Sequence, residues 1–327
     1  MDKVAEKILR RRMHGLYLSR SCGDLTRLAH ELLGMHCWFY RNVAFSAVIR
    51  GAELAGWKHA LTKTWLYRGT LHGVPMEDLP DLLALHAGEG RWEAPYREIA
   101  ERAMRLMEDG VYSRAEMRRI FAGDYDQPTI DRALSPWGGV FCELARMGKV
   151  AFRDMTSRDF DLIDAEPVKT AEQVLPELLN RFFAAYGPAT LNDAAWFFGL
   201  RGADRQRLST LSLEGYERWE YEGKTYYSMA ACDESDIPEL TLLSGFDPYI
   251  VSYAERSMML PDEYKRAVIL KSGICLPAIA VNGQVAGLWN IKKGEPEVAF
   301  FNAQPSRIRD EAWERVCSMI WRTADRM

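Results

Sequence analysis

The residues with the clearest capacity for chemistry stand together near the N-terminus, in the stretch 35-MHCWFY-40. Histidine titrates near neutral pH, so His36 can accept a hydrogen bond through its neutral ring or act as a base. Trp38 offers an indole N–H donor and a flat ring, but no acceptor. The alternative is ordinary packing, with His36 a core histidine whose polar atoms are satisfied within the fold. The stretch by itself leaves both interpretations open.

The elements that must position this stretch follow a recognisable order in the N-terminal part of the chain. Apolar residues recur at near-helical spacing over 4–18, 25–33 and 43–54 and predict three helices. The stretch 64-TWLYRGTLHGV-74 is rich in Thr, Trp, Tyr and Leu with Gly69 in its middle, which favours a β-hairpin.

The same order returns twice further along the chain. A helix over 96–109, the capping-box signature 113-SRAE-116, a helix over 129–147 and a hairpin over 150–164 form the second round. The third round has helices over 171–185 and 203–211, a break at Gly187-Pro188 with Thr190 or Asn192 as helix cap, and strands over 217–229 joined at Glu222-Gly223. Helices followed by a hairpin are typical of the winged helix. We therefore predict three winged-helix modules, at 1–92, 93–166 and 167–236.

From residue 237 the pattern changes to strands. Three stretches are rich in strand-forming residues, 239–253, 274–293 and 296–302, and Asn282-Gly283 between two apolar runs is a strong hairpin signal. A helix over 307–325 ends the chain. The predicted fold class is α+β, with the three modules followed by a small antiparallel β-barrel-like domain at 237–327.

Composition excludes several classes of protein. The 327 residues are 48% hydrophobic and 27% charged, which is ordinary for a globular protein, and no apolar run is long enough to span a bilayer. The six cysteines form no Cys-x-x-Cys pair, so we expect neither a metal site nor a disulfide framework, and a cytoplasmic location. The net charge of −4 argues against a uniformly basic nucleic-acid binder, although residues 1–20 hold six Lys and Arg.

Four stretches together identify a family. They are 64-TWLYRGTLHGVPMEDL-79, 186-YGPATLNDAAWFFGL-200, 245-GFDPYIVSYAERSMML-260 and 278-AIAVNGQVAGLW-289. In order and spacing this sequence resembles the AlkZ/YcaQ family of bacterial DNA glycosylases over nearly its full length. The resemblance implies three tandem winged helices and a β-barrel that form a channel for duplex DNA. It also implies excision of alkylated purines, including bulky adducts and interstrand crosslinks.

The resemblance also places a catalytic pair on the first stretch. In the family a Gln-x-Gln, or in one branch Gln-x-Asp, precedes a helix that carries an arginine in its third turn. With Arg50 as that arginine, His36 stands at the first position and Trp38 at the second. Neutral histidine can accept a hydrogen bond from the attacking water, whereas indole cannot, so Trp38 would instead stack on an exposed base or sugar.

Further site residues follow from the resemblance and the charges. Arg10, Arg11, Arg12, Arg50, Arg68 and Lys292 are candidates for DNA contact, and the hairpin tip at Asn282, Gly283 and Gln284 is expected to enter a groove. His72 and Asp247 are possible channel-lining residues. For Asp247 the simpler role is to cap a turn.

Three functions remain open at this point. The first is a DNA glycosylase, acting as a monomer on damaged duplex DNA without metal or cofactor. The second is a non-catalytic winged-helix DNA-binding protein, such as a lesion sensor or transcriptional regulator, that lost the glutamine pair. The third is an RNA- or protein-interaction module on the same fold.

Overall fold

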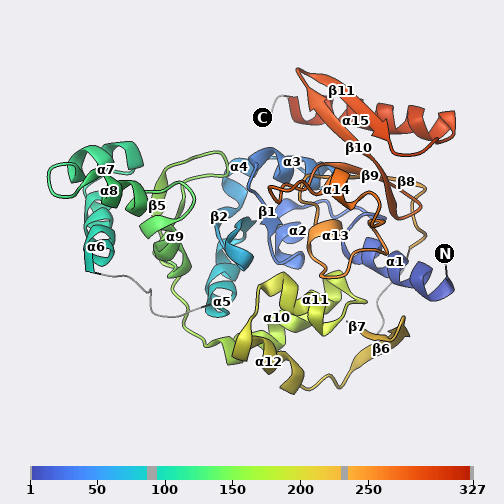
Figure 1. The fold of residues 1–327 in the computed structure, drawn as a ribbon, viewed down its shortest axis with the longest axis horizontal. Coiled ribbons are helices and arrows are strands. Elements are labelled where there is room, and N and C mark those ends of the chain that lie inside the picture. Colours follow the sequence, from blue (N-terminus) through green and yellow to red (C-terminus); the bar gives the residue numbers. More distant parts are fainter. Residues whose placement is uncertain (1, 87–93, 230–234, 325–327) are drawn as a thin grey trace. The chain divides into compact units, whose positions relative to one another are not determined.

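A computed structural model describes residues 2–86, 94–229 and 235–324 of the chain (Figure 1). The fold is α+β and divides into two compact units. Unit 1 comprises residues 1–55 and 177–327, and unit 2 comprises residues 56–176. Cys232 and the predicted boundary between residues 92 and 93 lie outside the described residues, and the four-part division stays a prediction.

Unit 1 begins with three helices and a two-residue strand. Their bounds are α1 (Lys3–Gly15), α2 (Leu25–Glu31), β1 (Met35–His36) and α3 (Tyr40–Ile49). Asp2 and Asp24 cap α1 and α2 by accepting hydrogen bonds from backbone N–H groups in the first turn. Seven consecutive residues of α3, 42–48, are buried, so the middle of the helix is enclosed on all sides. The helix starts and ends a few residues earlier than its predicted range of 43–54.

The second part of unit 1 contains helices and a separate hairpin. Its elements are α10 (Ala171–Tyr186), whose residues from 177 onward belong to this unit, α11 (Leu191–Phe198), α12 (Gly202–Thr210), β6 (Tyr216–Tyr221) and β7 (Lys224–Met229). Thr190 and Asp193 form the complete capping box that starts α11. Glu222 and Gly223 both have positive φ, which confirms the predicted two-residue turn between β6 and β7.

The C-terminal part of unit 1 is an open antiparallel sheet of four strands. Its order is β11-β10-β9-β8, formed by β8 (Leu240–Leu243), β9 (Ala278–Val281), β10 (Gln284–Lys292) and β11 (Glu295–Phe300). Helix α15 (Ser306–Ala324) packs along it (Figure 1). The predicted barrel closure is wrong among the described residues, because β8 and β11 end the sheet as its two edges.

Two short helices interrupt the segment between β8 and β9. They are α13 (Pro248–Val251) and α14 (Lys265–Val268). The stretch 239–253, predicted to be rich in strand, contains β8 but is helical over Pro248–Val251. Pro248 occupies the first helical turn, where its missing N–H is tolerated, and Asp247 caps the helix.

Unit 2 is built around four antiparallel strands in the order β3-β2-β4-β5. The strands are β2 (Thr62–Trp65), β3 (Leu71–Val74), β4 (Val150–Phe152) and β5 (Phe160–Leu162). The helices are α4 (Trp57–Ala60), α5 (Leu79–Ala84), α6 (Ala94–Glu108), α7 (Arg114–Phe121), α8 (Gln127–Ala133) and α9 (Gly139–Arg146), with 3-10 turns at Tyr67–Gly69 and Met76–Asp78. Trp65, Phe141 and Phe160 lie in its core. Two of the three predicted wing hairpins therefore share one sheet.

The predicted single helix over 129–147 is two helices, α8 and α9. The intervening 135-SPWGG-139 contains a proline and two glycines, which break helices. Gly139 has a φ of +69°, and a Cβ there would lie 2.2 Å from the carbonyl oxygen of Ala133. Ser113 precedes α7 as predicted, but its side chain makes no capping hydrogen bond.

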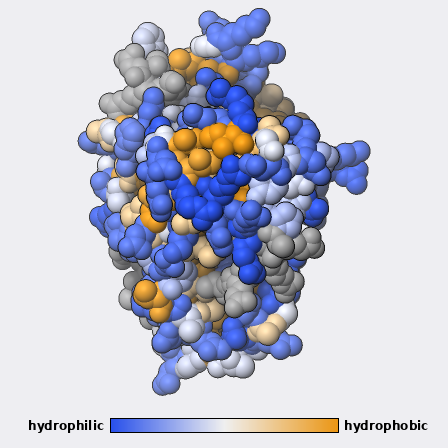
Figure 2. All heavy atoms as spheres, turned by 90° about the vertical axis from the view of Figure 1, so that its left-hand side faces the viewer, coloured by the Kyte–Doolittle hydropathy of each residue, from blue (hydrophilic) through white to orange (hydrophobic). Residues whose placement is uncertain are grey.

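The face of the molecule drawn in Figure 2 is largely hydrophilic, with its largest hydrophobic group near the upper centre and smaller ones elsewhere. Across the part of the chain that the structure describes, none of the helices is both long and apolar enough to cross a membrane.

Candidate functional site

His36 lies on β1, four residues before the start of α3. Its ring is stacked against that of Phe246, which is far from it in the sequence. The centroids of His36 and Phe246 are 4.1 Å apart with an angle of 5° between the ring planes. Phe39, which is 46% exposed, lies 6.2 Å from Phe246. We call His36, Phe39 and Phe246 the aromatic cluster. Within it, His36 is partly exposed as a residue and its ring plane is fixed, while its Nδ1 is buried.

Phe246 is held in an unusual backbone conformation. Its φ is +54°, in the left-handed region that bulky residues rarely adopt. Its N–H donates to the carbonyl oxygen of Cys275 at 3.1 Å. The next residue, Asp247, is fixed by accepting hydrogen bonds from the backbone N–H and hydroxyl of Ser244 and from the N–H of Tyr249. The surrounding loop thus determines where the Phe246 ring lies.

A buried ion pair connects that loop to α3. The side chains of Arg50 and Asp247 are both 0% exposed, and two Nη–O contacts of 2.7 and 3.0 Å join them. Arg50 Nε also donates to the carbonyl oxygen of Leu16 at 2.8 Å. The pair ties the C-terminal end of α3 to the segment that presents Phe246.

This burial corrects two predictions. A fully enclosed guanidinium does not reach a phosphate, so Arg50 is a structural residue and not a DNA contact. Asp247 does not line an open channel, because its carboxylate is enclosed and bonded on both oxygens. Its simpler predicted role, capping a turn, is confirmed by its hydrogen bond from Tyr249.

Asn42 is a member of the site that the sequence did not single out. It lies in the first turn of α3 and is 8% exposed. A Cβ built on Gly245 would lie 2.9 Å from Asn42 Oδ1, so the amide packs directly on the residue before Phe246. An Asn carbonyl is a hydrogen-bond acceptor, which indole is not. The only sequence signal was that Asn42 lies close after His36, two residues beyond the stretch 35–40. Trp38 itself is half-buried between β1 and α3.

His72, in unit 2, has a different environment. Its side chain is 5% exposed, its Nδ1 lies 3.2 Å from the carbonyl oxygen of Thr70, and its ring meets Tyr67 edge-on. Burial, reinforced by the charge of Arg68, lowers the pKa of His72 to about 3. The prediction of a channel-lining histidine is corrected, because this side chain is enclosed and neutral. Arg68 itself is half-buried.

The three consecutive arginines of α1 differ in exposure. Arg10 lies at the surface and pairs with Glu6 and Asp236. Arg11 is nearly buried, pairs with Glu217 and covers the ring of Trp219.

Arg12 is 1% exposed, donates to the carbonyl oxygen of Pro188 at 2.9 Å and lies 4.0 Å from the centre of the Tyr253 ring. Arg11 and Arg12 thus anchor α1 within unit 1. The predicted phosphate contacts of these two residues are corrected to structural roles, and Arg10 retains its surface position.

The hairpin tip at Asn282-Gly283 has the predicted turn, since both residues have positive φ. Gly283 is nevertheless buried, and its carbonyl oxygen accepts a hydrogen bond from the Tyr249 hydroxyl at 2.8 Å. Gln284 is exposed and donates to the carbonyl oxygen of Met258. The tip therefore packs against the segment that contains Tyr249 and Met258, and of its three residues only Asn282 and Gln284 are at the surface. At the other end of β10, Lys292 is exposed, 3.6 Å from Glu297.

No group of side chains in the described residues has the composition of a metal site. The five cysteines among those residues form no disulfide.

The whole fold matches that of a DNA glycosylase of known structure. The Streptomyces sahachiroi DNA glycosylase AlkZ superposes with a TM-score of 0.78 at 21% identity, over 99% of this chain and 98% of that one. A curated protein of the same organism, described as an interstrand DNA cross-link repair glycosylase, is 24% identical over 300 residues, covering 81% of this chain and 79% of that protein.

A family model described as DNA glycosylase AlkZ-like matches residues 56–315. The chain therefore belongs to the AlkZ-like DNA glycosylase family, which confirms the family predicted from the four stretches. The matched residues begin after α3, so the roles assigned to His36 and Trp38 stay predictions.

Proposed function

We propose that this protein is a DNA glycosylase that binds duplex DNA and hydrolyses the N-glycosidic bond of alkylated purines, with His36 as the residue that orients and deprotonates the attacking water. The observation that carries the proposal is the stack of His36 on Phe246. It holds a partly exposed histidine ring in one plane beside the start of α3, in a member of a DNA glycosylase family.

The stack engages the face of the His36 ring and not its in-plane nitrogens, of which Nδ1 is buried. Stacking uses the π face of the ring, whereas the nitrogen lone pair lies in the ring plane. In the proposed reaction, the oxygen of water attacks C1′ of the sugar while the C1′–N9 bond breaks. The bonding electrons pass to the purine and neutralise its positive charge, and the water proton passes to the unprotonated Nε2 of His36, because Nδ1 is buried. A purine alkylated at N7 or N3 needs no further proton to leave, because it is already cationic.

The second family position requires another acceptor. Trp38 has only an N–H donor, so its proposed role is to stack on the sugar or an exposed base. Asp247 is close in sequence to Phe246, but its oxygens are enclosed and already bonded to Arg50, Ser244 and Tyr249. We assign the second acceptor to the side-chain carbonyl of Asn42, which packs on Gly245 next to the aromatic cluster.

Binding to the duplex is assigned to the candidate contacts that remain at the surface. Arg10, Asn282, Gln284 and Lys292 are in unit 1, and the half-buried Arg68 is in unit 2. Because the chain carries a net charge of −4, we expect phosphate contacts to be few and localised. We expect one chain per lesion, since three non-identical winged-helix modules fit a symmetric dimer poorly.

A non-catalytic DNA-binding protein is the second candidate. It is favoured by Trp38, which cannot replace an acceptor, and by the packing of His36 on an aromatic ring, which a binding protein tolerates equally well. Loss of hydrolysis on this scaffold would leave a lesion sensor.

The test is single-turnover excision of N7-methylguanine from a labelled duplex. We expect His36→Ala to lower the rate at least about 100-fold, in line with the loss of a general base. His59→Ala, which removes an exposed histidine of unit 2, is the matched control and should leave the rate unchanged. Trp38→Ala should mainly weaken binding of the damaged duplex.

The outcomes separate the candidates. Wild-type protein that binds the duplex tightly but releases no base favours the lesion sensor. Excision that survives His36→Ala unchanged eliminates the proposed mechanism. A double variant, His36→Gln with Trp38→Gln, rebuilds the family pair and should excise at least as fast as wild type if the site is catalytic.

A further inference from the structure

A short exposed hairpin, with its turn at residues 270–273, joins α14 to β9 in unit 1 (Figure 1). Ile269 and Cys275 face each other as an antiparallel β-bridge. One residue further along, the N–H of Leu270 donates to the carbonyl oxygen of Ile274 at 2.9 Å. The bridge and this hydrogen bond fix the two arms of the hairpin against each other. We call its end the 270–273 turn.

The base of this hairpin is bonded to the aromatic cluster. The carbonyl oxygen of Cys275 accepts a hydrogen bond from the N–H of Phe246 at 3.1 Å, and the Phe246 ring is stacked on His36. Cys275 is 2% exposed, so this end of the hairpin belongs to the core. Between Gly273 and Cys275 the chain spans at most about 7 Å. The 270–273 turn is therefore held within reach of the proposed active site.

The exposed part of the hairpin combines an apolar side chain with positive charge. Leu270 is 38% exposed. From residue 264 to residue 277 the sequence has three basic residues and no acidic one. The three are Lys265, Arg266 and Lys271, and all are exposed. In a chain whose net charge is −4, this segment is a local excess of positive charge beside the aromatic cluster.

The composition of the 270–273 turn suits contact with a distorted DNA duplex. Enzymes that act on a base in a duplex take the nucleotide out of the base stack, which costs stacking and pairing free energy. Proteins that unstack a duplex insert apolar side chains, leucine among them, between base steps. Basic side chains next to such a residue bind the phosphates. Ser272 is short and Gly273 has no side chain, so Leu270 and Lys271 reach furthest from the turn.

We propose that the 270–273 turn is a DNA wedge. Leu270 enters the base stack beside the lesion and Lys271 binds an adjacent phosphate, while the damaged nucleotide leaves the stack for the site at His36. The wedge fills the position that this nucleotide leaves, so it stabilises the opened duplex. The proposal rests on the proposed function, because a wedge acts only on a duplex from which the protein draws a damaged nucleotide.

The first test detects unstacking without excision. The probe is a duplex with 2-aminopurine, whose fluorescence rises when it is unstacked, opposite a tetrahydrofuran abasic site. We expect the full-length wild-type protein to raise the fluorescence and Leu270→Ala to lose most of the increase. Leu270→Met, of similar volume, should retain it. Trp321→Ala removes an apolar side chain that is 82% exposed on α15 of the same unit, so it is the matched control and should behave as wild type.

The second test is single-turnover excision of N7-methylguanine paired with cytosine or mispaired with thymine. A mispaired base costs less to extrude. We expect Leu270→Ala to excise from the cytosine pair about tenfold more slowly than wild type, because the variant cannot fill the vacated position. The deficit should shrink for the thymine mispair. A residue required only for folding would slow both reactions equally.

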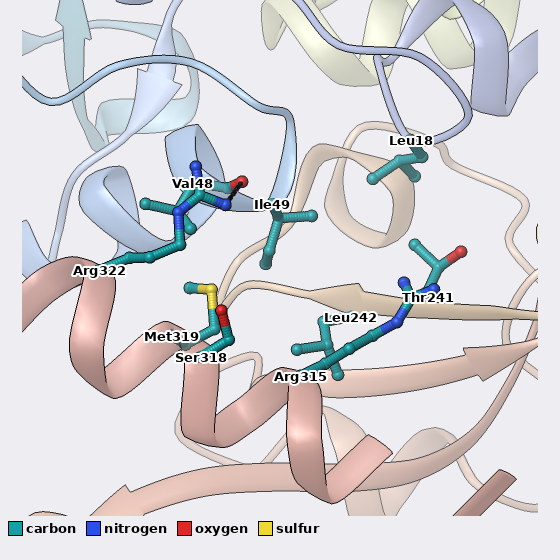
Figure 3. A pocket seen from close by; sticks show the side chains of 9 residues that line it. All are labelled: Leu18, Val48, Ile49, Thr241, Leu242, Arg315, Ser318, Met319 and Arg322. Carbon is teal, nitrogen blue, oxygen red and sulfur yellow. Dashed lines mark hydrogen bonds between the residues drawn. The ribbon is translucent and has the colours of Figure 1, made fainter. Parts of the chain in front are cut away.

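The contribution of charge is tested with Lys271→Gln. It should lower the slope of log affinity against log salt for duplex DNA by about 0.9, the value for one phosphate contact. Arg315→Gln is the control. Arg315 lines the groove between α3, β8 and α15 (Figure 3), where it donates to Glu311 at 2.7 Å and to the carbonyl oxygen of Leu240 at 3.1 Å. The slope for this variant should equal that of wild type.

The outcomes separate the wedge from the proposed function. Wild-type protein that binds no duplex overturns both. Excision by wild type, with unchanged fluorescence and unchanged excision in Leu270→Ala, eliminates the wedge and leaves the glycosylase. A fluorescence increase that depends on Leu270 but is accompanied by no excision supports the wedge and favours the lesion sensor. Unchanged thermal unfolding of the free variants shows that they are folded.

Discussion

The sequence singled out two histidines, His36 in unit 1 and His72 in unit 2. Comparing them shows how strongly the surroundings of a histidine determine its charge state and its possible role. Both end or lie in short strands, and both contact an aromatic ring. His72 is enclosed, so burial lowers its pKa to about 3 and keeps it neutral. His36 is partly exposed and stacked face to face with its Nδ1 buried, so Nε2 is the candidate to accept a proton. The same residue type is a packing element in one unit and a candidate base in the other.

The comparison depends first on the scaffold that holds Phe246 under His36. Asp247→Ala would leave Arg50 as an unpaired buried charge, so we expect the free energy of unfolding to fall by about 3–5 kcal/mol. Urea unfolding with a fluorescence readout measures it. Arg10→Ala removes a surface pair and should cost less than about 1 kcal/mol. Equal losses for the two variants would contradict the structural role given to the buried pair.

Because His72 is neutral in the folded protein, its burial predicts that the free energy of unfolding depends on pH. Its folded pKa of about 3 lies below the ordinary value of 6.5, so the unfolded chain binds more protons between these values. The stabilisation is complete above pH 6.5 and is lost as the pH falls toward 3, at about 1.4 kcal/mol per pH unit. His72→Phe should remove this slope from urea unfolding curves measured between pH 6.5 and 4.5. A wild-type minus variant difference that is constant with pH would show that His72 is charged in the fold.

The variant Gly245→Ala tests whether Asn42 acts together with His36 in excision. The added methyl of Gly245→Ala would lie 2.9 Å from Asn42 Oδ1 and must displace the amide. We expect a loss of about 1–3 kcal/mol in stability. Excision should slow by about tenfold if Asn42 holds the water, which corresponds to about one hydrogen bond. Gly123→Ala, where the structure has nothing within 4 Å, is the control for both measurements. Normal excision by a destabilised Gly245→Ala variant would remove Asn42 from the mechanism.

The smallest expected effect concerns the surface arginine of α1. Arg10→Gln should lower the slope of log affinity against log salt for duplex DNA by at most about 0.9, the value for one phosphate contact. Filter binding or fluorescence anisotropy between low and moderate salt measures that slope. Lys292→Gln is the parallel test on the sheet of unit 1. An unchanged slope in both variants would place the DNA-binding surface elsewhere.

Local features of the fold were predictable from the sequence because their signals are local. The Glu222-Gly223 turn, the capping of α11 by Thr190 and the hairpin of β2 and β3 follow from turn chemistry, capping and strand composition. The errors arose where a local pattern was ambiguous. The apolar positions over 129–147 suited one helix, but Pro136 and the glycines after it divided it. The strands from 278 to 300 suited a barrel, yet closure depends on pairing between distant edges, which no local pattern encodes.

For the site, the sequence by itself determined the residue types available: a histidine, a tryptophan and an asparagine before and within one helix, and a Gly-Phe-Asp-Pro turn far along the chain. Only the tertiary structure decided which of them meet. Arg50 and Asp247 are 197 residues apart in sequence and form one buried pair. Arg10 and Arg12 are neighbours in the same basic run, and one is at the surface while the other is enclosed. The reason is physical, because burial and electrostatics depend on which surfaces pack together, and that is a property of the whole folded chain.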